Sequence, residues 1–315
     1  MGRRSRTGGA RGDSARRGAK ARRAAKGHSS EGPVEGVFDT DTGTCELVRD
    51  RFSPGSWLLK VNGAESSHID LDDPLRLDFE YMRWFAALIE PRWPADRRLR
   101  ALHLGGGACS MARFLADVYP DSRQVAVEID GEMARLVREW FDLPRAPRLR
   151  LRVGEARAVL ESLRDDTRDL IIRDVFAGTA TPLPVTTAEF TAHVRRVLEP
   201  GGIYMVNCGD RRDLAMARRE AVTIGRAFTH VVMIADPAML AGRRTGNVVI
   251  AASDAPLGET PATMRALLSG AVPARMWESA KVEKFAAGAA VLHDPPALAE
   301  SSKDTDTTDA EDAES

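Results

Sequence analysis

Carboxylates and glycines stand at the ends of apolar segments in the middle of this 315-residue chain. Gly105, Gly106 and Gly107 follow the first of these segments, and the next one carries Glu128 and is followed by Asp130. Glycines let the backbone approach a ligand where any Cβ atom would clash. An acid at the end of the second strand of an α/β unit can accept both hydroxyl groups of a ribose. These residue types, in this order, predict a nucleotide-binding site.

The elements around these residues form one half of a nucleotide-binding α/β sheet. We expect a strand over Leu99–Leu104, a helix with Met111 and Phe114 on its apolar face, and a second strand over Val125–Ile129. The dinucleotide pattern GxGxxG is not met, because Ser110 stands where its third glycine would fall, and the P-loop lysine is absent. The alternative is that the three glycines only make a tight turn.

Strands and helices alternate through the rest of the central region. Further strands are predicted at Leu149–Val153, Asp169–Val175, Ile203–Asn207, Val231–Ile234 and Asn247–Ala252, and helices at Gly131–Trp140, Ala158–Leu163 and Leu214–Phe228, with another capped by Thr186 and Thr187 that runs to Leu198 and stops at Pro200-Gly201-Gly202. This alternation predicts a doubly wound α/β sheet that ends in an antiparallel strand pair. Ligands bind at the carboxyl ends of such strands. The polar residues there are Glu155 after the third strand, Asp174 in the fourth, and Asn207 and Asp210 with the fifth.

The segment before the sheet is predicted to be a small β-rich domain. Apolar runs at Cys45–Val48, Trp57–Val61 and Ser67–Leu71 read as strands. Asn62-Gly63 between two of them is the strongest short hairpin signal. A helix with apolar residues at helical spacing is expected over Leu77–Ile89.

The two ends of the chain have opposite charge, although the net charge is only −1. Residues 1–30 carry ten Lys or Arg and one acid, and residues 300–315 carry seven acids and one Lys. Both ends lack large apolar side chains, so we predict disorder. The predicted domains are a basic tail at 1–33, the β-rich domain at 34–76, the α/β domain at 77–296 and an acidic tail at 297–315. The basic tail could contact nucleic acid, but a solvated tail is the favoured interpretation.

Cysteine usage and hydropathy favour a cytoplasmic protein. Cys45, Cys109 and Cys208 are odd in number and have no metal-ligand spacing, so we predict no metal. We find no signal peptide and no apolar run long enough to cross a membrane. These features predict a reducing compartment.

Several stretches between Ser56 and Asp210 together resemble the spermidine synthase (polyamine aminopropyltransferase) family, within the S-adenosylmethionine-dependent methyltransferase superfamily. They are WLLKVNG, LGGG, VEID, GEA, DLIIRDVF, TTAEF and LEPGGIYMVN. The resemblance implies a methyltransferase-like (Rossmann-like) doubly wound sheet joined to a small N-terminal β-sheet. It also implies a homodimer or tetramer that transfers an aminopropyl group from decarboxylated S-adenosylmethionine to putrescine.

The resemblance also assigns roles to individual residues. Gly105–Gly107 would bind the cofactor, Glu128 its ribose, and Glu155 with Ala156 would lie near the adenine. Asp174 would be the base and Tyr81 would shape the polyamine channel. The role of Asp174 has a chemical ground, because a primary amine attacks only when neutral, and a carboxylate can attract the ammonium and accept its proton. The alternatives are that Asp174 caps a loop and that Tyr81 is a core aromatic residue.

The sequence departs from the family at acidic positions. Ala108 stands where the glycine loop of the family continues with an Asp, Ala177 lies where the loop after the base carries a second acid, and Met82-Arg83 replaces His-Glu. Two other functions therefore stay open: a methyltransferase that uses ordinary S-adenosylmethionine, and a non-catalytic cofactor-binding protein. Nucleic-acid binding through the basic tail is the weakest alternative.

Overall fold

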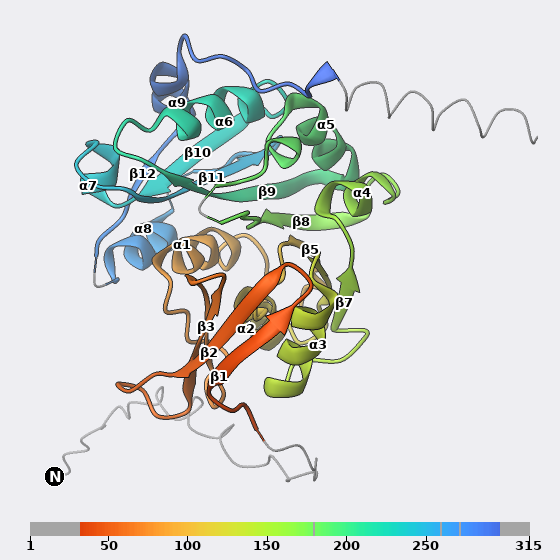
Figure 1. Cartoon of the computed structure of the whole chain (residues 1–315). Helices are drawn as coiled ribbons and strands as arrows, with labels where there is room; N and C mark the ends of the chain where they lie inside the picture. Colours follow the sequence, from red (N-terminus) through yellow and green to blue (C-terminus); the bar gives the residue numbers. More distant parts are fainter. Residues whose placement is uncertain (1–31, 179, 259, 271, 297–315) are drawn as a thin grey trace, which may run out of the picture. The chain divides into compact units, whose positions relative to one another are not determined.

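The structure, a computed structural model, describes residues 32–178, 180–258, 260–270 and 272–296. The predicted acidic tail at 297–315 lies outside these ranges, and so does the predicted basic tail apart from residues 32 and 33. The described residues contain two sheets and the helices around them (Figure 1). No helix in these ranges has the length and apolar character that a membrane crossing requires.

The first sheet is a four-stranded antiparallel meander. Its strands β1 (Gly36–Thr40), β2 (Gly43–Arg49), β3 (Ser56–Val61) and β4 (Ala64–Asp70) pair in chain order. Asn62 (φ 50°) and Gly63 (φ 81°) join β3 to β4. Two successive residues with positive φ match the type I′ turn that suits a two-residue hairpin. The hairpin predicted from Asn-Gly is confirmed.

The second sheet has eight strands in the order β12-β10-β11-β9-β8-β5-β6-β7. Its parallel part consists of β5 (Arg100–Leu104), β6 (Arg123–Glu128), β7 (Leu149–Val153), β8 (Arg168–Arg173) and β9 (Leu198–Asp210). The strands β10 (His230–Ala235), β11 (Gly246–Ser253) and β12 (Arg275–Trp277) pair antiparallel. The doubly wound α/β class with a small N-terminal sheet is therefore confirmed.

Helices cover both faces of the large sheet. They are α1 (Glu80–Ile89), α2 (Ser110–Val118), α3 (Gly131–Trp140), α4 (Ala156–Glu161), α5 (Ala188–Val197), α6 (Ala215–Gly225), α7 (Pro237–Leu240), α8 (Pro261–Leu268) and α9 (Ser279–Ala286), with a 3₁₀ turn at Leu183–Val185. Figure 1 shows α5, α6 and α9 on one face and α1 and α8 on the other. The apolar residues of β5, β8 and β9 are buried, as expected for strands covered on both faces.

Two predictions about the sheet were wrong. Strand β9 begins at Leu198, five residues before the predicted start, and includes Pro200-Gly201-Gly202. The irregular register with β8, where Arg168 faces Leu198 and Leu170 faces Ile203, accommodates these residues. The antiparallel part also has a third strand, β12, which pairs with β10. With three residues, β12 is too short to show an alternating pattern.

The strand order places a crevice beside β5. Strand β5 pairs with β6 on one side and with β8 on the other, so the chain changes direction across the sheet at this point. Ligands of open α/β sheets bind at such a switch point, outside the carboxyl ends of the strands. The domain boundary predicted at residues 76 and 77 falls between the two sheets, after β4 and before α1, and stays a prediction.

Candidate active site

A cavity of about 1370 Å³ lies at the carboxyl ends of β5, β6 and β8. The glycine loop after β5, Glu128 at the end of β6 and Asp174 after β8 line one side of it. Ser66 and Ser67 of β4 and Tyr81 of α1 line it as well, so residues of both sheets contribute. The cavity exceeds the roughly 300–1,000 Å³ of a typical small-molecule pocket.

The glycine loop approaches other parts of the protein very closely. A Cβ atom on Gly105 (φ 91°) would lie 2.1 Å from the backbone oxygen of Asp174, and one on Gly107 (φ 47°) would lie 2.7 Å from Ser67 Oγ. Positive φ values at both positions also disfavour any other residue. The loop therefore needs glycine to pack against β8 and β4, a requirement separate from contact with a ligand.

Glu128 holds the glycine loop through its carboxylate. Its Oε2 accepts hydrogen bonds from Gly106 N–H (3.2 Å) and Gly107 N–H (3.1 Å), and its Oε1 accepts one from Asp130 N–H (3.2 Å). The side chain is 9% exposed. Burial raises the pKa of Glu128, and the three backbone N–H groups oppose that rise. A carboxylate offers about four acceptor positions, so Oε1 keeps room for a ligand hydroxyl.

Asp130 is not among the residues that line the cavity, and its predicted place in the cofactor site stays a prediction. One carboxylate oxygen caps α3 through Met133 N–H (2.8 Å), and the other accepts from Thr42 N–H (2.8 Å) and Thr42 Oγ–H (2.7 Å). Although burial favours the protonated form, these hydrogen bonds lower the pKa of Asp130 to about 2. Asp41 adds a second contact, since it accepts from the Gly131 N–H (2.8 Å). The acid joins the β1–β2 turn to α3.

Glu155 and Ala156 line the cavity beyond the end of β7. The Glu155 carboxylate also caps α4, because it accepts hydrogen bonds from Arg157 N–H (2.9 Å) and Ala158 N–H (2.7 Å). Glu155 is exposed and Ala156 is buried. Both residues lie where the sequence predicts them, at the carboxyl end of the third parallel strand.

Asp174 follows β8 and receives hydrogen bonds from two other elements. Tyr81 Oη donates to its Oδ2 (2.7 Å), and Asn207 Nδ2 donates to its Oδ1 (3.0 Å). Burial raises the pKa of Asp174, and Asn207, Tyr81 and the nearby Arg173 charge oppose that rise. Burial and the Asp174 charge hold the pKa of Tyr81 well above its usual value, so Tyr81 stays a neutral donor. This cluster places a carboxylate in the cavity whose pKa is set by opposing effects, burial on one side and its neighbours on the other.

Asn207 contributes a hydrogen-bond acceptor that no described residue uses. Asn207 is 2% exposed, and its side chain lines the cavity. Its Oδ1 has no hydrogen-bond partner within the described ranges. A buried polar atom without a partner is costly. A ligand N–H group beside Asp174 would satisfy it.

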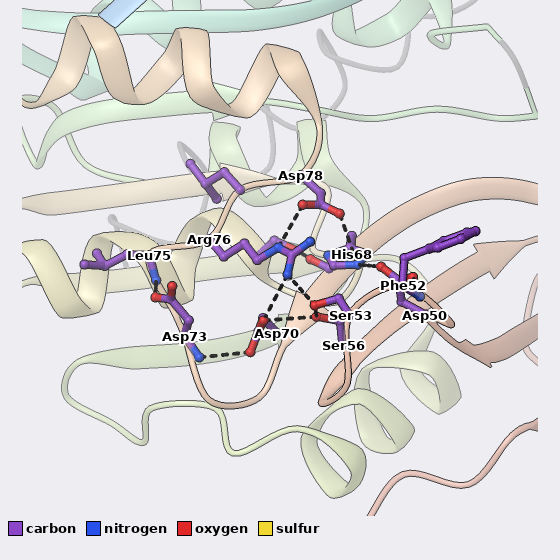
Figure 2. A network of polar contacts seen from close by, with 12 residues as sticks. Asp50, Phe52, Ser53, Ser56, His68, Asp70, Asp73, Leu75, Arg76 and Asp78 are labelled. Carbon is purple, nitrogen blue, oxygen red and sulfur yellow. Dashed lines mark hydrogen bonds and ion pairs between the residues drawn. The ribbon is translucent and has the colours of Figure 1, made fainter. Parts of the chain in front are cut away.

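A polar network fixes the chain that leads into Tyr81 (Figure 2). Arg76 binds Asp78 (Nε to Oδ1, 3.0 Å) just before α1, and it also contacts Asp70 of β4 (3.5 Å) and Ser53 Oγ. His68 Nε2 lies 3.1 Å from a carboxylate oxygen of Asp78. These contacts bind the segment before α1 to the small sheet. They therefore fix the start of α1, where Tyr81 lies.

Asp50, His68 and Asp78 in this network are close enough together to hold a cation. Two observations favour a structural crosslink instead. Arg76 already supplies a positive charge to Asp78. His68 Nδ1 has no partner within the described ranges, so coordination through Nε2 would leave a buried Nδ1–H without an acceptor.

The cavity lining carries an excess of negative charge. Its carboxylates among the described residues are Glu65, Asp78, Glu80, Glu128, Glu155 and Asp174. The lining arginines, Arg157 and Arg244, are each paired with an acid, Asp294 (2.6 Å) and Asp236 (2.7 Å). His103 is neutral at pH 7, because burial lowers its pKa to about 4. Such a lining favours a cationic ligand.

Ala108 is fully buried and is not among the residues that line the cavity. Its N–H donates to Ser67 Oγ (3.0 Å), so its backbone is bound to β4. Ala177, at the other acidic position of the family, lies exposed in the loop after β8. The sequence did not predict that four further residues line the cavity, because none of them belongs to a local motif: Ser67, Asp78, Glu80 and Arg244.

Comparison with known proteins agrees with this architecture. A methyltransferase domain model matches residues 102–206. A polyamine aminopropyltransferase of Chromobacterium violaceum is 32% identical over 149 residues, which cover 46% of this chain and 56% of that protein. The chain thus spans about half the length of the curated relatives that it matches.

Solved structures extend the likeness to a larger share of the chain. The crystal structure of a probable spermidine synthase from Corynebacterium glutamicum has 48% sequence identity and a TM-score of 0.80, over 84% of this chain and 97% of that one. A spermidine synthase from Thermotoga maritima shares the fold at 16% identity, with a TM-score of 0.54 over 73% of this chain and 76% of that one. Because this relative is 48% identical and is matched over nearly its whole length, the chain belongs to the spermidine synthase family.

Proposed function

We propose that the protein transfers an aminopropyl group from decarboxylated S-adenosylmethionine to an amine of a polyamine such as putrescine. The observation that carries this proposal is the cluster of Tyr81, Asp174 and Asn207 in the cavity that also contains the glycine loop and Glu128. The reaction requires a carboxylate beside the place where two bound molecules meet, and this cluster meets that requirement.

The residues of the cavity suit both substrates. Glu128 Oε1 can accept a ribose hydroxyl, and Glu155 and Ala156 line the region assigned to the adenine. A cavity of about 1370 Å³ has room for a nucleoside and a short amine side by side. The excess of carboxylates in its lining favours a polycation over a neutral or anionic acceptor.

Asp174 is proposed as the base. The Asp174 carboxylate first accepts a proton from the bound ammonium, which frees the lone pair of the amine nitrogen. The neutral nitrogen then attacks the carbon bonded to the sulfonium, the new C–N bond forms, the C–S electrons pass to sulfur as methylthioadenosine leaves, and the product nitrogen carries the positive charge that the sulfonium lost. Asn207 Oδ1, which lacks a partner among the described residues, can accept a second N–H of the same amine and so orient its lone pair.

The test supplies the full-length protein with decarboxylated S-adenosylmethionine and putrescine and follows release of methylthioadenosine. The expected result is turnover that needs both substrates. Calorimetry with the decarboxylated and the ordinary cofactor shows which of them binds more tightly, and we expect the decarboxylated form. Sedimentation of the same sample tests the homodimer or tetramer that the family implies.

Two results would contradict the proposal. Tight binding of decarboxylated cofactor without methylthioadenosine release, for putrescine and for longer polyamines, would indicate a non-catalytic protein. Formation of S-adenosylhomocysteine from ordinary S-adenosylmethionine, together with a methylated acceptor, would indicate a methyltransferase.

A further inference from the structure

Arg173 is a charged residue that directly follows the apolar residues Leu170, Ile171 and Ile172 of β8. It is the last residue of β8 and directly precedes Asp174, yet its side chain is 0% exposed. Ile172 and Asp174 line the cavity and Arg173 does not, as expected when successive side chains of a strand point to opposite faces. The guanidinium therefore lies behind the cavity, on the other side of the sheet.

Two elements meet at the Arg173 guanidinium. Its Nη2 donates to Glu220 Oε2 of α6 (2.6 Å), and its Nη1 donates to the backbone oxygen of Val185 (3.0 Å). Glu220 is 1% exposed. Within the described ranges, Arg173 Nε and Glu220 Oε1 have no hydrogen-bond partner. The pair is thus deeply buried and only partly satisfied.

Such a pair is a poor way to stabilise a core. Desolvation of two charges offsets much of their attraction, and apolar residues of similar volume often serve stability equally well. The position of the pair offers another explanation. Val185 ends the loop that begins after Asp174, and Val175, Phe176 and Pro184 of this loop line the cavity. Arg173 is thus connected to both ends of the loop. It directly precedes Asp174 at the first end, and it donates a hydrogen bond to the Val185 oxygen at the other.

We propose that Arg173, paired with Glu220, is a positioning residue that fixes Asp174 and the loop after it, and that its charge acts on the Asp174 carboxylate. This inference rests on the proposed function, in which Asp174 is the base. The role is specific to charge, because an apolar pair would fill the same space without a field at Asp174.

The electrostatic surroundings agree with this role. Burial raises the pKa of Asp174, while Asn207, Tyr81 and Arg173 lower it. Around the pair lie Tyr204 and Cys208, whose pKa values burial raises far enough to keep both neutral at pH 7. Asp210 is the other charged group near Glu220. Arg173 is therefore a positive charge that acts on Asp174, and Glu220 compensates it.

The experiment measures kcat against pH for the full-length protein and its variants. The acid limb of the pH–rate profile is the range in which kcat falls as Asp174 becomes protonated. In Glu220→Gln the charge of Arg173 is uncompensated, so this limb should move to lower pH. The expected shift is about one pH unit, the order expected when a neighbouring buried unit charge is removed. In the double variant Arg173→Met, Glu220→Met the nearer positive charge is lost, so the limb should move to higher pH. Arg173→Lys keeps the charge and should keep the limb of the wild type.

Asp169 supplies a matched control at the other end of β8. It is fully buried and pairs with Arg97 (2.7 Å) and Arg100 (3.0 Å). Asp174 lies five positions further along the chain, roughly 17 Å away at the rise per residue of a strand. Asp169→Asn should lower the melting temperature and leave the acid limb in place. Limbs that coincide in Glu220→Gln, the double variant and the wild type would overturn the proposal, as would shifts in one direction only.

A second readout separates this inference from the proposed reaction. The carboxyl carbon of Asp174, labelled with ¹³C and assigned through Asp174→Asn, reports its titration without turnover. If the wild type releases no methylthioadenosine, the proposed function fails, and the NMR titration still decides the role of Arg173. Opposite shifts of the Asp174 titration in the two variants support the role, and unchanged titrations refute it. Should Glu220→Gln not fold, Arg173→Lys compared with the double variant gives the same decision.

Discussion

Glu128 at the end of β6 and Asp174 after β8 lie on the two sides of the glycine loop that follows β5, and their carboxylates are held in different ways. Glu128 receives three backbone N–H groups, from residues 22, 21 and 2 positions away in the chain. Asp174 receives two side-chain donors, Tyr81 and Asn207, from residues 93 and 33 positions away. The Glu128 carboxylate is therefore surrounded by backbone N–H dipoles of the glycine loop and of Asp130, whose positions are fixed by the fold. The Asp174 end is assembled from separate elements whose side chains can adjust.

From this difference we propose that Glu128 belongs to the part of the cavity that binds the cofactor and Asp174 to the part that reacts. Backbone dipoles around Glu128 hold a fixed acceptor for a ligand that must be placed the same way each time. The donors around Asp174 allow its protonation state to change, since Tyr81 and Asn207 can each reorganise when the carboxylate gains a proton. The comparison predicts that variants at the two ends affect different quantities.

Asp174→Asn is expected to have the largest effect. The change keeps the shape and removes the proton acceptor, and positioned proton transfer is typically worth about 10²–10⁴ in rate. Turnover should fall by that factor, while calorimetric cofactor affinity barely changes. Asp210→Asn is the matched control, because Asp210 also lies at the carboxyl end of a parallel strand, β9, but accepts from Ala217 N–H (2.7 Å) at the start of α6 and is not among the residues that line the cavity. Equal turnover of wild type and Asp174→Asn would remove Asp174 from the mechanism.

Glu128→Ala should act on binding instead. Loss of one hydrogen bond to a charged acceptor costs about 1.5–3 kcal/mol, so cofactor affinity should weaken roughly ten- to hundredfold. Glu128→Gln keeps an acceptor oxygen and should weaken it less, which separates the ligand contact from support of the glycine loop. Titration calorimetry at pH 7 measures both. An unchanged affinity in Glu128→Ala would show that Glu128 serves only the loop.

Asp130→Ala should affect stability and leave binding unchanged. The pKa of Asp130 falls from its usual 3.8 to about 2 in the folded protein. A depressed pKa contributes stability above pH 3.8 that is lost as the pH falls toward 2. The variant should therefore be about 2 kcal/mol less stable at pH 7, and the difference should vanish near the lower value. Urea unfolding at several pH values measures this difference in stability. A large loss of cofactor affinity in the variant would instead show that Asp130 takes part in cofactor binding.

Local patterns predicted the sheet and the Glu128 end well. The glycine turn, the strand that carries Glu128, the Asn-Gly hairpin and helix α3 all follow from residues within a few positions of one another. The roles assigned to Gly105–Gly107, Glu128, Glu155, Ala156, Tyr81 and Asp174 stay predictions. The structure brings all of these residues to one cavity.

Long-range contacts explain what the sequence did not reveal. The contact of Asp130 with Thr42 could not be predicted, because Thr42 lies 88 positions away in the chain. Arg173 was included in a buried strand, but its partner Glu220 lies 47 positions further on. The early start of β9 depends on an irregular register with β8, which no pattern within β9 records. In each case a second element decides the role of the residue.

The contact between the β1–β2 turn and α3 has a consequence for synthesis on the ribosome. Thr42 is made 88 residues before Asp130, which at about 5–20 residues per second is an interval of roughly 4–18 s. The apolar face of the small sheet, including Leu47, Trp57 and Leu59, packs in one cluster with Val137 and Phe141 in and just after α3. Until α3 has been made, these apolar side chains lack the partners that cover them in the folded protein, so the nascent chain exposes them.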